Sequence, residues 1–177
     1  MALYVDPTGV QGCVGLIGYQ GEPAVFTGVC VSAMPASLKK TEGEAYAQFA
    51  RDYGIFFLFD DDVPTVDFYS VPRLDIAAVD GEGGFLAAVG GSFDLCDPVP
   101  LVYIAKDRRC YLITEDSTQF LTMAAQWREK LRPYEDVRLY PSKQDAKMDF
   151  AIDDLVQMPE YQRSLALMEE EKAKRNG

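Results

Sequence analysis

The sequence predicts an α+β fold, a mostly antiparallel sheet with helices packed on one face or at one end. Three features support this prediction. Short segments rich in β-branched and aromatic residues fill most of the first two thirds of the chain, short hairpin-like connections join them, and helical periodicity dominates after residue 115. With 177 residues, of which 48% are hydrophobic, the chain has the length and composition of one folded domain, residues 1–177.

The N-terminal region, about residues 1–32, is predicted to form a β-hairpin. Its two strands would be Cys13–Tyr19 and Ala24–Val31, with the turn-forming residues QGEP between them. The glycines of GVQGCVGLIG do not follow the GxGxxG pattern, and no Gly-Lys-Ser/Thr comes after them. A phosphate-binding loop is therefore not indicated.

Residues 41–54 form the clearest predicted helix. Thr41 and Glu44 have the spacing of a capping box, and Gly54 suits the left-handed position that ends a helix. One apolar face follows from the helical spacing of four residues: Tyr46, Phe49, Ala50 and Tyr53.

The middle of the chain is predicted to supply the sheet. The expected strands are Ile55–Phe59, Val66–Val71, Phe85–Val89, Leu101–Ala105 and Cys110–Thr114, and the segment from Leu74 leads into a glycine turn. The residues KDR between the last two strands indicate a tight hairpin, so these two strands should pair antiparallel.

Helices are expected at the end of the chain. From Glu115 the apolar residues Phe120, Ala124, Trp127 and Leu131 share a helical face. C-terminal helices should occupy about residues 142–175, one capped near Ser142 and one starting at Pro159. Seven residues of these elements are predicted to be largely buried: Phe49, Tyr53, Phe57, Val102, Ile104, Phe120 and Trp127.

The amino-acid composition disfavours several classes of function. The chain has no histidine, which removes the commonest general base, the Ser–His and Cys–His pairs and the usual zinc ligand. No complete catalytic motif is present, so no enzymatic activity and no cofactor are expected. The net charge of −11 disfavours binding to nucleic acid and anionic membranes and would attract a basic partner.

The four cysteines are scattered along the chain and are predicted to be buried free thiols. The sequence shows no signal-like or membrane-spanning run, so a cytoplasmic location is the default expectation.

The stretch FFLFDDDVP, from Phe56 to Pro64, is the most unusual feature. It resembles the acidic strand of nucleotide hydrolases, but the glycine loop that such enzymes need is missing. A divalent ion held by two of Asp60, Asp61 and Asp62 together with Asp67 stays an alternative. The favoured interpretation is a core strand, buried over Phe56–Phe59, whose acidic end is exposed at two or more aspartates and keeps the edge from pairing with other chains.

Gly83–Ala124 resembles the SUKH superfamily. In that family a strand ending in glycine and an acidic loop precede a Pro-Val/Ile-Tyr-Tyr/Phe-Ile strand, a return strand and a helix opening with Ser-Phe-x-x-Phe-Leu. Here the corresponding residues are Phe85–Gly91, then Pro100, Val102, Tyr103 and Ile104, then Tyr111–Ile113, then Ser117, Phe120 and Leu121. Upstream, Met34–Pro35 and Tyr53–Gly54 stand at the family's Leu-Pro and Asn-Gly positions, so the resemblance covers Met34–Met123.

The resemblance implies an immunity protein, a non-catalytic module that binds a toxin domain, often a nuclease, and blocks it. Surface carboxylates would mimic the phosphates that a nuclease binds. The candidate partner-binding residues are Asp60, Asp61, Asp62, Asp67, Asp94 and Asp97. Two other classes remain open: a carboxylate- or metal-dependent enzyme centred on Asp60–Asp62, Asp67 and Asp80–Glu82, and a structural or oligomeric adaptor.

Overall fold

A computed structural model describes residues 27–90 and 98–150, the backbone of the short pieces 3–5 and 11–12, and residues 152, 166 and 173–174. Its strands are β1 (Leu3–Val5), β2 (Gln11–Gly12), β3 (Val29–Val31), β4 (Phe56–Phe57), β5 (Tyr69–Val71), β6 (Leu74–Val79), β7 (Phe85–Val89), β8 (Leu101–Ile104), β9 (Cys110–Thr114), β10 (Arg132–Pro133) and β11 (Arg138–Tyr140). Its helices are α1 (Leu38–Tyr53), α2 (Phe120–Met123) and α3 (Lys143–Asp149), with single 3-10 turns at η1 (Ser117–Gln119) and η2 (Ala124–Gln126).

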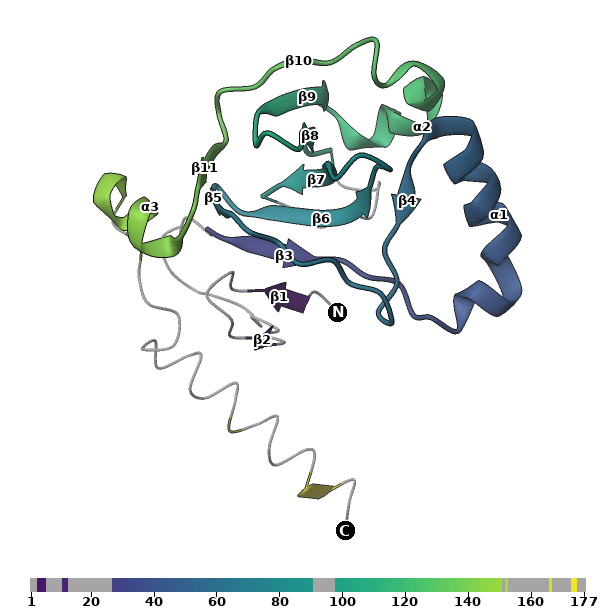
Figure 1. The fold of residues 1–177 in the computed structure, drawn as a ribbon, viewed down its shortest axis with the longest axis horizontal. Helices are drawn as coiled ribbons and strands as arrows, with labels where there is room; N and C mark the ends of the chain where they lie inside the picture. Colours follow the sequence, from purple (N-terminus) through teal and green to yellow (C-terminus); the bar gives the residue numbers. More distant parts are fainter. Residues whose placement is uncertain are drawn as a thin grey trace.

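The predicted α+β class is confirmed. Nine strands form one sheet in the order β10-β9-β8-β7-β6-β3-β1-β2, with β4 also paired to β6, and β11 pairs with β5 in a separate sheet. In Figure 1 α1 stands at one side of the large sheet beside β4, and α2 lies close to the same end.

Antiparallel pairing dominates the centre of the sheet. β6, β7, β8 and β9 pair in succession, each antiparallel to the next. The predicted hairpin between β8 and β9 is confirmed: Arg108 N–H donates to Ala105 O, and Arg108 takes a left-handed φ of 65° within the turn. The predicted strands match the observed ones here, except that β8 ends one residue earlier, at Ile104.

The outer edge of β6 is shared by two strands. β3 pairs with its first half in parallel, Val29 opposite Leu74, whereas β4 pairs with its second half antiparallel, Phe57 opposite Ala78. The register of β6 against β7 shifts between Ile76 and Ala78, which marks a bulge at this point. The sheet is therefore mixed, although most of its pairs are antiparallel.

The core lies on both faces of the sheet. Four of the predicted core residues are buried, because they lie on the central strand β8 or point into the sheet from the segment after β9: Val102, Ile104, Phe120 and Trp127. The other three predicted core residues, Phe49, Tyr53 and Phe57, are only partly buried. They belong to α1 and β4, at the margin of the sheet, where fewer neighbours cover them.

The start of α1 differs from the prediction. The helix begins at Leu38, three residues before Thr41, and its N-cap residue Ser37 makes no side-chain capping bond. Thr41 is thus inside the helix, and its hydroxyl donates to Leu38 O instead of capping. The predicted end is confirmed: Gly54 has φ 66° and its N–H donates to Ala50 O.

The predicted continuous helix after Glu115 is wrong. The chain forms η1, α2 and η2 instead, three short pieces in succession. Phe120, Ala124 and Trp127 nevertheless all point inward, as the spacing predicted. Further on, the predicted cap is confirmed, since Ser142 accepts from Asp145 N–H at the start of α3.

Three strands are shorter in the structure than predicted. Of Ile55–Phe59 only Phe56–Phe57 is a strand, β4. Of Val66–Val71 only Tyr69–Val71 is a strand, β5, and it pairs with β11 outside the main sheet. Cys13–Tyr19 lies outside the described residues, as does most of the helix expected from Pro159, of which residues 166 and 173–174 are described and helical. In the described part of the N-terminal region, β1 pairs antiparallel with both β2 and β3, whereas only Val29–Val31 of the second expected strand is described as a strand.

We expect Trp127→Ala to destabilise the fold by about 3–5 kcal/mol, because the side chain is 2% exposed and a large cavity would remain. The measurement is urea unfolding followed by circular dichroism. Leu121→Ala is the control, since Leu121 is 62% exposed on the nearby short helix α2 and should change stability by no more than about 0.5 kcal/mol. Equal losses in the two variants would contradict the assigned packing.

Candidate functional site

The acidic turn, defined as Asp60–Asp62, lies at the surface. All three residues are exposed, which confirms the prediction that at least two would be. Asp60 Oδ1 accepts from Ala36 N–H at 2.9 Å, and Asp61 Oδ1 pairs with Lys39 Nζ at 2.6 Å. No side-chain partner of Asp62 is found in the described part of the chain. Three negative charges thus face one positive charge, and the turn keeps a net negative charge.

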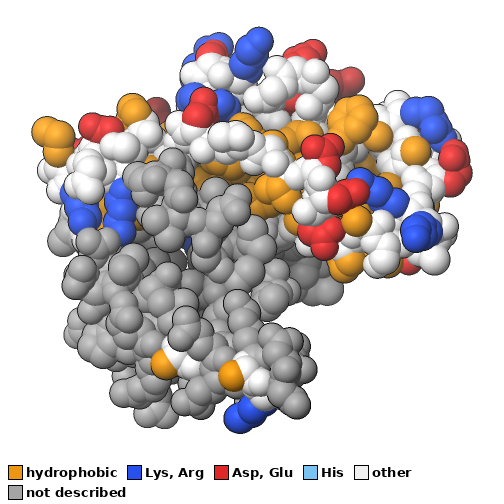
Figure 2. Space-filling view, turned by 60° about the horizontal axis from the view of Figure 1, so that its bottom comes forward, with side chains coloured by type: hydrophobic (Ala, Val, Ile, Leu, Met, Phe, Trp, Pro, Cys, Tyr) orange, Lys and Arg blue, Asp and Glu red, His pale blue; other side chains and the backbone are white. Residues whose placement is uncertain are grey.

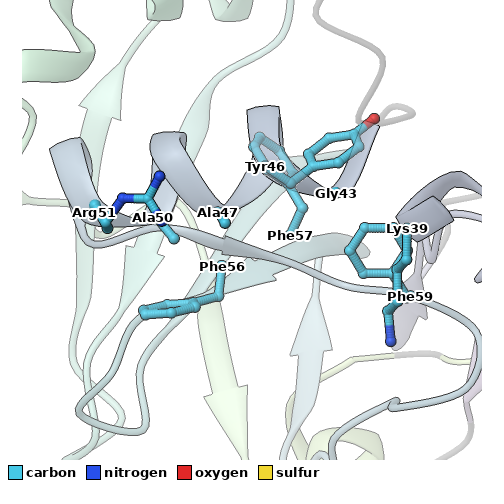
Figure 3. Close-up of a pocket in the computed structure, with 9 residues that line it drawn as sticks. All are labelled: Lys39, Gly43, Tyr46, Ala47, Ala50, Arg51, Phe56, Phe57 and Phe59. Carbon is cyan, nitrogen blue, oxygen red and sulfur yellow. The ribbon is translucent and has the colours of Figure 1, made fainter. Parts of the chain in front are cut away.

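An apolar hollow of about 580 Å³ opens beside the acidic turn, between α1 and β4 (Figure 3). We call it the aromatic groove. It is lined by Lys39, Gly43, Tyr46, Ala47, Ala50, Arg51, Phe56, Phe57 and Phe59. In Figure 2 hydrophobic and acidic side chains lie next to one another on the right of the molecule, the side on which α1 stands in Figure 1.

The prediction that Phe56–Phe59 is buried throughout is wrong. Leu58 is buried, but Phe57 and Phe59 are partly buried and Phe56 is 48% exposed. The physical reason is the position of β4, which has a partner strand on one edge and α1 against one face only. Figure 3 shows Phe57 pointing toward α1 and Phe56 pointing to the other side of the strand.

Aromatic contacts hold α1 against β4. The ring of Tyr46 packs edge-on against Phe57 and Phe59, with centroids 5.9 and 5.4 Å apart. Phe49 packs against Phe57 at 5.3 Å. Even so, α1 has no buried residue along its 16 residues. A helix of this length usually buries an apolar stripe, so α1 leaves apolar surface uncovered.

The two cations at the groove are already paired within the chain. Lys39 pairs with Asp61 and lies 4.9 Å above the ring of Phe59, and Arg51 Nη2 lies 2.6 Å from Glu44 Oε1. Neither is left to attract an anion. The groove therefore offers an apolar interior with a negative rim at the acidic turn.

Asp67, another predicted partner-binding residue, contacts a different part of the described chain. Asp67 is exposed, but its Oδ1 lies 2.6 Å from Arg108 Nη2 in the β8–β9 turn. Arg108 in turn lies over the rings of Phe68 and Phe85. Asp67 thus takes part in a separate contact that ties the turn to the sheet. Asp94 and Asp97 lie outside the described residues.

Asp80 is the most enclosed carboxylate of the candidate enzyme residues. Its side chain is 0% exposed and accepts from Tyr103 Oη at 2.5 Å, Gly84 N–H at 2.7 Å and Glu82 N–H at 2.9 Å. Arg128 Nη2 adds an ion pair at 3.2 Å. A side chain at Gly84 would overlap the ring of Tyr103, so glycine is required there.

These bonds determine the electrostatics of the Asp80 network. Burial alone would raise the pKa of the Asp80 carboxyl, but the hydrogen bonds from Tyr103, Gly84 and Glu82 outweigh burial and hold the pKa below its usual range. Burial and the adjacent Asp80 raise the pKa of Tyr103 to about 12. An acceptor this fully occupied has no free lone pair aimed at solvent. The Asp80 network therefore fits a structural role, in which its hydrogen bonds stabilise the β6–β7 turn.

A second buried carboxylate lies on β6. Asp75 is 1% exposed, pairs with Arg73 at 3.0 Å and lies opposite Cys30 on β3. Burial raises the pKa of Asp75, while Arg73 opposes the shift. Burial also raises the pKa of Cys30, and it raises that of Cys110 to about 12. Both thiols are free and unreactive in this environment, whereas Cys13 and Cys96 lie outside the described residues.

No group of three or more acidic or cysteine side chains converges on a metal-binding arrangement within the residues the structure describes. In the same residues, no helix is both long enough and apolar enough to cross a bilayer. No family model, curated protein or solved structure matches the chain in comparisons with known proteins.

Sequence reasoning identified the acidic turn but missed the groove beside it. Helical spacing places Tyr46 on the apolar face of a helix, and the apolar run places Phe56 in a buried strand. The signal that could have found the groove is the abrupt change from apolar to acidic residues after Phe59, because a strand so short and so charged at one end is typical of a sheet margin.

We expect Asp80→Asn to lower stability at pH 7 by about 3 kcal/mol, because an Asn amide has one acceptor oxygen in place of two and would leave donors around this fully buried side chain without an acceptor. The folded-state pKa of Asp80 is depressed, so its contribution is fully present above the unfolded pKa of about 3.9 and is lost as pH falls through the folded pKa. The stability difference between wild type and variant should therefore shrink below about pH 4.

Urea unfolding at a series of pH values measures this difference. Asp136→Asn removes the same charge from an exposed residue and should leave stability nearly unchanged at every pH. A gap for Asp80→Asn that stays constant from neutral to acid pH would show that the Asp80 charge does not stabilise the fold.

Proposed function

We propose that this chain is a non-catalytic protein-binding module that docks a basic partner on the acidic turn and the adjoining aromatic groove. The observation that carries the proposal is their adjacency: an uncovered aromatic surface, with Phe56 48% exposed, lies directly beside three exposed carboxylates. Interfaces commonly combine an apolar, aromatic centre with a charged rim.

Each part supplies a different component of binding. Burying Tyr46, Phe56 and Phe59 under a partner would provide the hydrophobic gain. The carboxylates would steer a basic partner and select against acidic ones, because long-range attraction raises association rates more than it raises affinity. The net charge of −11 acts in the same direction over the whole molecule.

The resemblance to the SUKH superfamily favours one kind of partner. Under that reading the chain is an immunity protein of the cytoplasm, and the partner is a toxin domain, for example a nuclease. A nuclease carries a basic groove for the phosphates of its substrate. An acidic inhibitor that covers the groove would block substrate by occupying the same positive surface.

The double variant Asp61→Lys, Asp62→Lys tests the proposal. The partner to use is the product of the neighbouring gene, where an immunity protein is expected to have its toxin. We expect the double variant to slow association with this neighbouring toxin by about tenfold or more at low salt and to flatten the salt dependence. Folding stability should change by no more than about 1 kcal/mol, because the ion pair that is lost between Lys39 and Asp61 is exposed. Stopped-flow association at several salt concentrations is the measurement.

The matched control is Glu135→Lys, Asp136→Lys. These two adjacent exposed acids lie in the segment between β10 and β11, away from α1 in Figure 1, and the change in net charge is the same. Equal slowing in both variants would show that the effect comes from net charge alone and that the acidic turn is not part of the interface. Failure of the wild type to bind the neighbouring toxin would overturn the proposed function.

A further inference from the structure

We propose that an extended segment of the partner, apolar on one face and carrying lysine or arginine at one end, adds to β4 as a further antiparallel strand in the aromatic groove. This inference rests on the proposed function in one respect, that the partner is basic. It goes further in assigning the docking mode and the chemistry of the docked segment.

The hydrogen-bond pattern leaves the outer edge of β4 open. Leu58 N–H donates to Ala77 O and Leu58 O accepts from Met34 N–H, so both groups of Leu58 face the sheet. Main-chain groups of neighbouring residues in a strand point to opposite edges, so those of Phe57 and Phe59 point outward. Phe59 O accepts from Asp62 N–H within the acidic turn.

Three outward groups then remain: the N–H and C=O of Phe57 and the N–H of Phe59. No partner for any of them is found in the described part of the chain. An added strand can form two bonds with Phe57 and one with Phe59, in the manner of strand addition at an exposed sheet edge.

The groove has room for the side chains of such a strand. Its α1 wall includes three small residues, Gly43, Ala47 and Ala50. A Cβ at Gly43 would meet no atom within 4 Å, so space remains there. A residue paired with Phe57 points its side chain to the same face as Phe57, that is, toward α1. Apolar side chains of the added strand would therefore lie in the groove.

The acidic turn selects which strand can dock. A second copy of this chain, with its charge of −11, would bring its own acidic turn to the shared edge and be repelled. Asp61 and Asp62 lie just beyond the end of β4 and favour lysine or arginine on the incoming strand. Charge thus excludes self-pairing and admits a basic segment.

A defined peptide tests this docking mode. The probe is an acetylated, amidated octapeptide that begins with two lysines and continues with alternating valine and threonine, labelled for fluorescence anisotropy. Antiparallel addition places the lysines at the acidic turn and the valines opposite Phe57. Valine amides then bond β4, and threonine amides face solvent.

N-methylation of the valine amides should weaken binding about tenfold or more, because the valine N–H that donates to Phe57 O is lost and the added methyl groups would press against the edge of β4. N-methylation of the threonine amides should change it less than about twofold. Equal affinities for the two methylated peptides, or no binding of the parent peptide at millimolar concentration, would overturn strand addition.

The groove is tested on the protein side by Gly43→Leu. Leucine is the better helix former, and Gly43 has no strained φ, so the variant should fold while its side chain fills the groove. Ala45→Leu is the control, because Ala45 lies on α1 and does not line the groove. Gly43→Leu should weaken peptide binding about tenfold or more, and unchanged binding would overturn the inference.

The two proposals fail differently. If the neighbouring toxin binds wild type and binds the Gly43→Leu and Asp61→Lys, Asp62→Lys variants poorly, but the two methylated peptides have equal affinities, the proposed function holds and strand addition is wrong. If the peptide shows the expected methylation pattern but the toxin does not bind, strand addition holds and the proposed toxin partner is wrong.

Discussion

The outer edge of β6 is divided between two strands, and the rest of the structure near the candidate site depends on that division. β3 takes Leu74–Ile76 in parallel, and β4 takes Ala78 and Val79 antiparallel. Between them the bulge in β6 lets Ala77 O accept from Leu58 N–H. Because β3 occupies half of the edge, β4 has room for only two paired residues. The chain between them forms α1, which packs beside β4 without covering its outer edge. An uncovered groove follows directly from this shared edge.

The far end of α1 is held much more firmly than its middle. Trp127 Nε1 donates to Tyr53 O at 2.9 Å, which satisfies a carbonyl in the last turn of the helix. Arg128 stacks 4.4 Å from the Trp127 ring and reaches Asp80 in the β6–β7 turn. The buried charge of Asp80 thereby connects the sheet to the C-terminal end of α1. Along the remainder of α1, the rings of Tyr46 and Phe49 contact β4. Firm fixation at one end and light packing elsewhere keep the groove in place without filling it.

Sequence patterns predicted the central part of the fold and missed its margins, for physical reasons. β7 to β9 were predictable because apolar runs and a turn between β8 and β9 specify antiparallel neighbours locally. The parallel pairing of β3 with β6 depends on residues 43 or more positions apart, and no local pattern encodes it. Helical spacing correctly placed Phe120 and Trp127 inside, but it did not show that the helix breaks into short pieces. Exposure of Asp60–Asp62 followed from the cost of burying charge, whereas exposure of Phe56 depends on which strand lies at the edge.

Asp80 and the acidic turn show how the environment of a carboxylate decides whether it has a structural role or contributes charge to the surface. Asp80 is surrounded by donors from three parts of the chain, so its charge is compensated locally by the β6–β7 turn, Tyr103 and Arg128. The acidic turn has one cation, Lys39, for three carboxylates, so most of its charge acts on the surroundings. An open strand edge next to a neutral turn would pair with any extended chain, including a copy of itself. Placing uncompensated charge at the end of that edge converts a general tendency to pair into a preference for basic segments.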